Sequence, residues 1–138
     1  MDALTQLTKL LAGREKTCAQ ARADLEKRDF AAPDIDAAIA RATELGYLDD
    51  ARVAKRLAVA ALRDGWAGEV LHARLTGKGI DEATASRATQ DAIDELAWRE
   101  PAAAEALVKK RHLDGVKAAR FLASRGFSED LCNRYGNG

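Results

Sequence analysis

The chain has 138 residues, and its charges cancel because 22 lysines and arginines balance 22 aspartates and glutamates. This balance excludes a uniformly basic nucleic-acid coat and an acidic tail protein. Charged residues make up 32% of the chain, which contains only 2 prolines and 10 glycines. Such a composition favours long solvated helices over strands and turns. Because 30 of the residues are alanine, we expect an all-helical protein packed largely with small side chains.

Helical periodicity predicts nine helices in three groups of three. The expected helices cover residues 2–12, 17–28 and 33–45, then 50–63, 67–78 and 82–99, and finally 101–110, 116–125 and 129–135. We therefore predict an elongated, curved array of three tandem three-helix repeats, at residues 1–48, 49–99 and 100–138. The last helix is short, which is typical of a truncated or frayed final repeat.

The second helix of each repeat ends in one shared pattern. A leucine is followed by two residues, a basic residue, a glycine or aspartate, and a large apolar residue, at positions 25–30, 75–80 and 122–127. This pattern predicts a Schellman-type helix end, in which Asp29, Gly79 and Gly126 would take the left-handed conformation. The spacings of 50 and 47 residues between the apolar positions indicate a repeated unit.

The junction between the first two repeats carries three signals within a few residues. Gly46 can end one helix in the left-handed conformation. Asp49 can cap the next helix, and Leu48 and Val53 are spaced for a hydrophobic staple. We expect a tight helix-turn-helix link here rather than a flexible linker.

These residues also carry a resemblance to a known family. The residues concerned are Gly46-Tyr47-Leu48-Asp49-Asp50, Arg52-Val53-Ala54, Asp64-Gly65-Trp66, and Leu75 with Lys78-Gly79-Ile80-Asp81. In this pattern the chain resembles the RecX regulatory proteins of bacterial recombination, most closely over residues 45–88. The resemblance implies tandem three-helix repeats that bind the RecA filament, lodge in its helical groove, and suppress its ATPase and strand-exchange activities. It implies a non-enzymatic regulator of DNA repair and the SOS response.

The helix expected at 50–63 carries a basic stripe that fits this function. At about 100° per residue its basic side chains gather on one side, and Val53, Leu57, Ala60 and Ala61 gather on another. Two more basic residues lie one turn apart on the next helix. The predicted contacts with the RecA groove are Arg52, Lys55, Arg56, Arg63, Arg74 and Lys78. A solvated helix face is the alternative interpretation.

The C-terminal repeat is the most basic part of the chain. Residues 96–138 contain eight basic and five acidic side chains. Its candidate phosphate contacts, toward single-stranded DNA within the filament, are Lys109, Lys110, Arg111, Lys117, Arg120 and Arg125. The alternative is a solvated surface with favourable charges at helix ends. Zero net charge shifts the prediction away from DNA as the sole ligand and toward a protein filament.

Neither the aromatic residues nor the histidines indicate another kind of site. Large aromatic side chains at helix junctions usually plug gaps, and core positions are predicted for Trp66, Trp98, Tyr47, Phe30, Phe121 and Phe127. His72 and His112 are isolated, and no glycine-rich phosphate loop is present. We therefore predict no catalytic residue, no metal ligand and no cofactor.

Two other functions stay open from the sequence alone. One is a helix-turn-helix-like DNA-binding protein that acts independently of RecA, and the other is a helical adaptor for another protein. Only two cysteines, Cys18 and Cys132, occur, far apart and without an export signal or a membrane-length apolar run. These features predict reduced thiols in a cytoplasmic protein with no membrane contact, and we expect a monomer.

Overall fold

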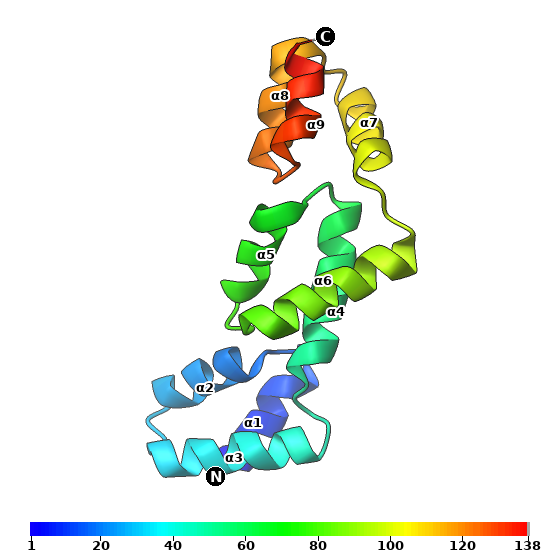
Figure 1. Ribbon diagram of the computed structural model, residues 1–138. Helices are drawn as coiled ribbons and strands as arrows, with labels where there is room; N and C mark the ends of the chain where they lie inside the picture. Colours follow the sequence, from blue (N-terminus) through cyan, green and yellow to red (C-terminus); the bar gives the residue numbers. More distant parts are fainter. Residues whose placement is uncertain (138) are drawn as a thin grey trace.

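The computed structural model describes residues 1–137, which form nine helices and no strand (Figure 1). The helices are α1 (Ala3–Ala12), α2 (Cys18–Lys27), α3 (Ala32–Glu44), α4 (Asp50–Arg63), α5 (Gly68–Thr76), α6 (Glu82–Leu96), α7 (Glu100–Lys110), α8 (Gly115–Ser124) and α9 (Glu129–Gly136). The predicted all-helical class is confirmed. The expectation that α6 continues to Arg99 is wrong, because Ala97 takes the left-handed conformation at φ 50° and the chain turns there.

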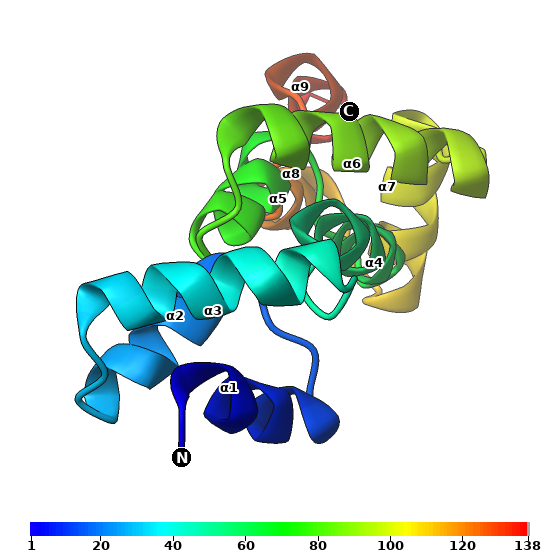
Figure 2. The same ribbon diagram turned by 90° about the horizontal axis from the view of Figure 1, so that it is seen from below.

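The molecule is an elongated array of three-helix repeats, with the chain termini at opposite ends (Figure 1). The first repeat comprises α1–α3, the second α4–α6 and the third α7–α9. Seen from below, α4 is viewed almost end-on, whereas α3 and α6 lie across it (Figure 2). The helix α4 therefore runs along the length of the array and leads the chain away from the first repeat. No helix within residues 1–137 is both long and apolar enough to cross a membrane.

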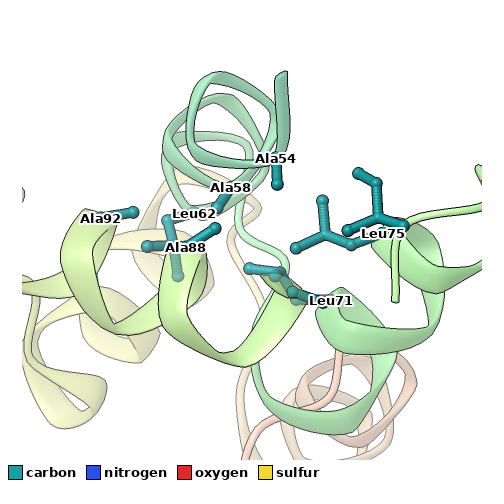
Figure 3. Packing of buried hydrophobic residues seen from close by; sticks show 9 residues of the cluster. Ala54, Ala58, Leu62, Leu71, Leu75, Ala88 and Ala92 are labelled. Carbon is teal, nitrogen blue, oxygen red and sulfur yellow. The ribbon is translucent and has the colours of Figure 1, made fainter. Parts of the chain in front are cut away.

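Each repeat encloses its own hydrophobic core, as expected for a stack of small units. The core of the second repeat is built from Ala54, Ala58 and Leu62 of α4, Leu71 and Leu75 of α5, and Ala88 and Ala92 of α6 (Figure 3). Alanines at the contact let two helices approach closely. On α4, Ala54 and Ala58 are fully buried, whereas Ala60 is exposed.

The predicted Schellman-type ends are present. Asp29, Gly79 and Gly126 have φ values of 63°, 87° and 95°. In the first and third copies the bond that closes the motif forms, from the Phe30 amide to the Leu25 carbonyl at 3.3 Å and from the Phe127 amide to the Leu122 carbonyl at 3.1 Å. These ends turn the chain sharply, so that the third helix of each repeat folds back over the second.

The second helices α2, α5 and α8 follow one another end to end along one side of the array (Figure 1). The Thr17 hydroxyl at the start of α2 donates to the Lys78 carbonyl after α5, at 2.8 Å. The Ala67 amide at the start of α5 donates to the Arg125 carbonyl after α8, at 2.9 Å. A carbonyl just after the end of one helix therefore meets a donor at the start of the next at both junctions.

Glycine is required where these helices meet. A Cβ atom on Gly79 would overlap the side chain of Ala19, and a Cβ atom on Gly126 would overlap the carbonyl of Ala67. The glycine of the helix end therefore has two functions: it adopts the left-handed conformation and it allows the neighbouring repeat to approach.

Candidate functional site

The four predicted basic residues of α4 line one groove between α4 and α6. The groove has a volume of about 590 Å³, its lining includes the small apolar side chains Val59 and Ala60, and Asp91 and Glu95 line it from α6. The basic residues in its lining are Arg52, Lys55, Arg56 and Arg63. The sequence pattern therefore placed these side chains on a common surface correctly, but it did not reveal the carboxylates opposite them.

Two of these arginines are engaged by a carboxylate from the first repeat. Arg52 Nε lies 3.2 Å from Glu15 Oε1, and Arg56 Nε lies 2.6 Å from Glu15 Oε2. The hydrogen bond from Arg56, with a smaller contribution from Arg52, lowers the pKa of Glu15 even though partial burial opposes the shift. Because Glu15 lies between α1 and α2, this pair of contacts links the first repeat to the second. No local sequence signal could have identified Glu15.

The other two cations of the groove differ in their pairing. Lys55 Nζ lies 3.3 Å from Glu95 Oε1. By contrast, no carboxylate in the described part of the chain lies within 4.0 Å of the Arg63 guanidinium. The charge of Arg63 is therefore not neutralised by a neighbouring carboxylate, whereas Arg52, Lys55 and Arg56 are each paired with one.

The motif at residues 46–50 builds the junction beside this groove. Gly46 is left-handed at φ 78°, Leu48 is buried, and Asp49 accepts from the Arg52 amide at 3.2 Å. Asp50 Oδ1 accepts from the Cys18 amide at 2.8 Å and so caps α2 of the preceding repeat. The two aspartates thus cap different helices, and the second cap was not predicted.

Tyr47 does not belong to the core, and this prediction was wrong. Its side chain is 49% exposed. The reason is geometric: the Tyr47 amide closes the end of α3 on the Ala42 carbonyl at 2.8 Å, and the next residue, Leu48, turns inward in its place.

Arginines from the two predicted surfaces meet on one tryptophan. The guanidinium carbons of Arg74 and Arg125 each lie 4.1 Å from the centre of the Trp66 ring. Those of Arg111 and Arg125 lie 4.8 and 5.0 Å from the Phe121 ring. Cations and aromatic rings therefore alternate in one continuous series, which we call the arginine–aromatic chain. Its members, in spatial order, are Arg111, Phe121, Arg125, Trp66 and Arg74. It spans α7, α8, the α4–α5 connection and α5.

A second groove lies beside this chain, between the second and third repeats. It has a volume of about 480 Å³. Its polar and aromatic lining comprises Arg63, Asp64, Trp66, Trp98, Lys110 and Arg125. Trp98 packs against the cores of both repeats, with its ring 6.2 Å from that of Phe127, which confirms the predicted packing role.

The remaining predicted site residues lie on open surface. Lys109, Lys117 and Arg120 are exposed on α7 and α8. Lys78 is exposed at the end of α5 and lines a small depression with Glu15 and Arg56. The twelve predicted residues therefore do not form one site: they fall on the α4–α6 groove, the arginine–aromatic chain and scattered exposed positions.

The structure offers no activated nucleophile among its thiols. Burial, followed by the carboxylate of Asp50, raises the pKa of Cys18, and burial together with Glu100 raises that of Cys132. Within residues 1–137, no group of three or more histidine, cysteine, aspartate or glutamate side chains is placed to hold a metal ion.

Comparison with known proteins identifies the family. The regulatory protein RecX of Trichlorobacter lovleyi is 30% identical over 147 aligned residues, which cover 94% of this chain and 90% of the relative. This chain belongs to the RecX family. A second RecX, from Pectobacterium atrosepticum, is 33% identical over 127 residues, covering 86% of this chain and 76% of that protein. No protein-family model matches the chain.

Solved RecX structures share the fold. RecX from Lactobacillus salivarius superposes with a TM-score of 0.75 at 19% identity, covering 96% of this chain and 91% of that one. Another crystal structure of regulatory protein RecX gives a TM-score of 0.77 at 16% identity, covering 99% and 72%. The predicted array of tandem three-helix repeats is therefore confirmed as the RecX architecture.

Proposed function

We propose that this RecX-family chain binds the RecA filament in its helical groove and inhibits the ATPase and strand-exchange activities of RecA. The observation that carries the proposal is the 30–33% identity to proteins named regulatory protein RecX over most of the chain. An elongated array of similar repeats can contact several filament subunits at once, so weak contacts add up to a useful affinity. The chain would act by occupying space and holding subunits, without catalysing a reaction or using a cofactor.

The α4–α6 groove is the proposed contact with RecA. Arg63 is its strongest candidate, since no carboxylate of the described chain neutralises it. Arg52 and Arg56 keep 51% and 57% of their side-chain surface exposed while they contact Glu15, so they can still reach a partner. Rim charges of this kind act mainly on the association rate and on the choice of partner. Lys78, just after α5, would extend the contact.

The third repeat is the proposed contact with single-stranded DNA inside the filament. Lys109, Lys117 and Arg120 are exposed there, and no carboxylate of residues 1–137 lies within 4.0 Å of them. Contacts of this kind neutralise phosphates and depend strongly on salt. We further propose that the protein acts as a monomer in the cytoplasm.

The decisive experiment is a titration of RecA ATPase on single-stranded DNA with this protein. We expect inhibition well below one molecule per RecA subunit, and absence of inhibition at a molar excess would contradict the proposal. Arg63→Glu should weaken the inhibition, whereas Lys27→Glu, the same charge change on exposed α2, should not. Steeply salt-dependent binding to duplex DNA without any effect on RecA would instead favour an independent DNA-binding protein.

A further inference from the structure

The arginine–aromatic chain holds three guanidiniums in fixed positions on the surface of the third and second repeats. The guanidiniums of Arg111 and Arg125 both lie over the Phe121 ring, and those of Arg125 and Arg74 both lie over the Trp66 ring. A guanidinium stacked on a ring keeps its N–H groups free at its edge, and the ring limits its rotation. The stacking therefore orients donors before any ligand arrives, which lowers the entropic cost of binding.

These guanidiniums are not neutralised by the protein itself. Although the chain contains 22 acidic residues, none in the described part lies within 4.0 Å of Arg74, Arg111 or Arg125. Arg125 has one backbone partner, since its Nη1 donates to the Asp64 carbonyl at 3.0 Å. Arg74 and Arg111 are exposed. Unpaired, oriented arginines are suited to bidentate recognition of an anion.

The spacing of the cations points to a ligand with regularly placed negative charges. Both guanidinium carbons on Trp66 lie 4.1 Å from the same ring centre, so they are at most twice that distance apart. Lys110 adds a further cation on the groove that Trp66 and Arg125 also line. A sugar–phosphate backbone offers anions at short, even intervals, whereas the carboxylates of an acidic peptide depend on its sequence and rotamers.

The same stacking determines which part of a nucleic acid, backbone or base, can contact this site. Nucleic-acid bases usually stack on free aromatic faces in proteins that bind single strands. Here, two guanidiniums cover Trp66 and two lie on Phe121. We propose that the arginine–aromatic chain, together with Lys110, binds the sugar–phosphate backbone of a single-stranded nucleic acid without stacking its bases.

This site names the residues and the binding mode of the proposed DNA contact of the third repeat. It rests on the proposed function only for the biological role of the binding. The isolated protein binds the strand by itself, so the test needs no RecA. A failure to bind the isolated strand leaves the ATPase titration unaffected, and a failure to inhibit RecA leaves this binding unaffected. The two results can therefore be told apart.

The first experiment compares three ligands at low salt by anisotropy of labelled probes and by tryptophan fluorescence. The ligands are oligo-dT, an abasic strand of equal length, and poly-glutamate. Because the chain has only two tryptophans, Trp98→Phe isolates the signal of Trp66. We expect oligo-dT and the abasic strand to bind within about threefold of each other and to change the Trp66 signal. Four phosphate contacts, made by Arg74, Lys110, Arg111 and Arg125, predict a salt slope of about −3 on logarithmic axes.

Three results would overturn the proposal. Failure of oligo-dT to bind at low salt would show that the chain has no such site. A loss of more than about tenfold for the abasic strand would show that bases are stacked. Poly-glutamate binding as tightly as oligo-dT would identify an acidic peptide as the ligand instead.

A matched pair of double variants distinguishes binding at this site from a general effect of positive charge. Arg74→Gln with Arg111→Gln should weaken oligo-dT binding by about tenfold or more. Lys27→Gln with Arg134→Gln removes the same charge from exposed positions that have no aromatic partner, and should weaken binding by no more than about threefold. Equal losses in the two double variants would contradict the assignment. Unchanged circular dichroism of both confirms that they fold.

Discussion

The carboxylate of Asp50 accepts a hydrogen bond from the backbone amide of Cys18 at 2.8 Å, although the two residues lie 32 positions apart. Asp50 begins α4, and Cys18 begins α2. The first residue of one repeat thus satisfies a free amide at the start of a helix in the repeat before it. A negative charge at this end of α2 also interacts favourably with the helix dipole. The cap therefore stabilises a helix and a repeat junction together.

Asp50→Ala should lower the free energy of unfolding by about 1–2 kcal/mol, because the variant loses a helix cap and a charged hydrogen bond. Urea denaturation followed by circular dichroism measures the change. Asp36→Ala is the matched control: Asp36 contacts Arg22 at 2.7 Å, but both side chains are largely exposed. Such a surface pair contributes at most about 1 kcal/mol. Equal losses in the two variants would show that the cap is unimportant.

The contact between Glu15 and the two arginines of α4 can be separated from their proposed contact with RecA by charge reversal. Arg52→Glu with Arg56→Glu should weaken RecA inhibition and also loosen the first junction, because three carboxylates then face one another. Adding Glu15→Lys restores opposite charges at the junction while the groove stays reversed. We expect the triple variant to recover thermal stability but not inhibition of RecA ATPase. Recovery of both would assign the arginines to the junction alone.

The lowered pKa of Glu15 gives the junction a defined pH dependence. Its pKa is below its ordinary value of 4.5 in the folded chain, so the unfolded state binds a proton more readily. The ionised carboxylate therefore stabilises the fold fully above about pH 4.5, and this contribution is lost as the pH falls through the folded pKa. Thermal unfolding from pH 7 to pH 3 should show a smaller acid loss in Glu15→Gln. Because the arginines are exposed, the difference should not exceed about 1 kcal/mol. Identical pH profiles would contradict the prediction.

Gly68 and Gly115 offer a direct test of how closely the repeats approach. Both begin a helix in the left-handed conformation, at φ 51° and 53°. A Cβ atom on Gly68 would overlap the Gly126 carbonyl of the third repeat, whereas a Cβ atom on Gly115 would meet nothing within 4 Å. Gly115→Ala should therefore cost only the left-handed penalty of about 1–2 kcal/mol. Gly68→Ala should lower the free energy of unfolding, measured by urea denaturation, clearly more than Gly115→Ala does. Equal losses would show that the second and third repeats can move apart to make room for the methyl group.

The sequence predicted the features that depend on neighbouring residues. The helix ends at Asp29, Gly79 and Gly126 and the cap at Asp49 each follow from a few adjacent side chains, and all are present. The common surface of the α4 arginines also follows from helical periodicity alone.

The features that depend on how repeats pack were not predictable. Glu15 meets Arg56 across 41 positions, and Arg125 reaches Trp66 from another repeat. Such pairs depend on the angle between repeats, which helical periodicity does not encode. Tyr47 shows a related limit: an aromatic residue after a helix end was assigned to the core, but the direction of the turn placed Leu48 there instead.

At both junctions of the column α2, α5 and α8, the group offered by the later repeat is a main-chain carbonyl, of Lys78 in one case and of Arg125 in the other. A substitution at Lys78 keeps the carbonyl and changes only an exposed side chain, whereas the Arg125 side chain itself bridges two repeats through Trp66 and the Asp64 carbonyl. At the first junction, the bend between repeats and the chemistry of the outer surface can therefore vary separately. The surface charge at Lys78 can thus change while the hydrogen bond that joins the first two repeats stays in place.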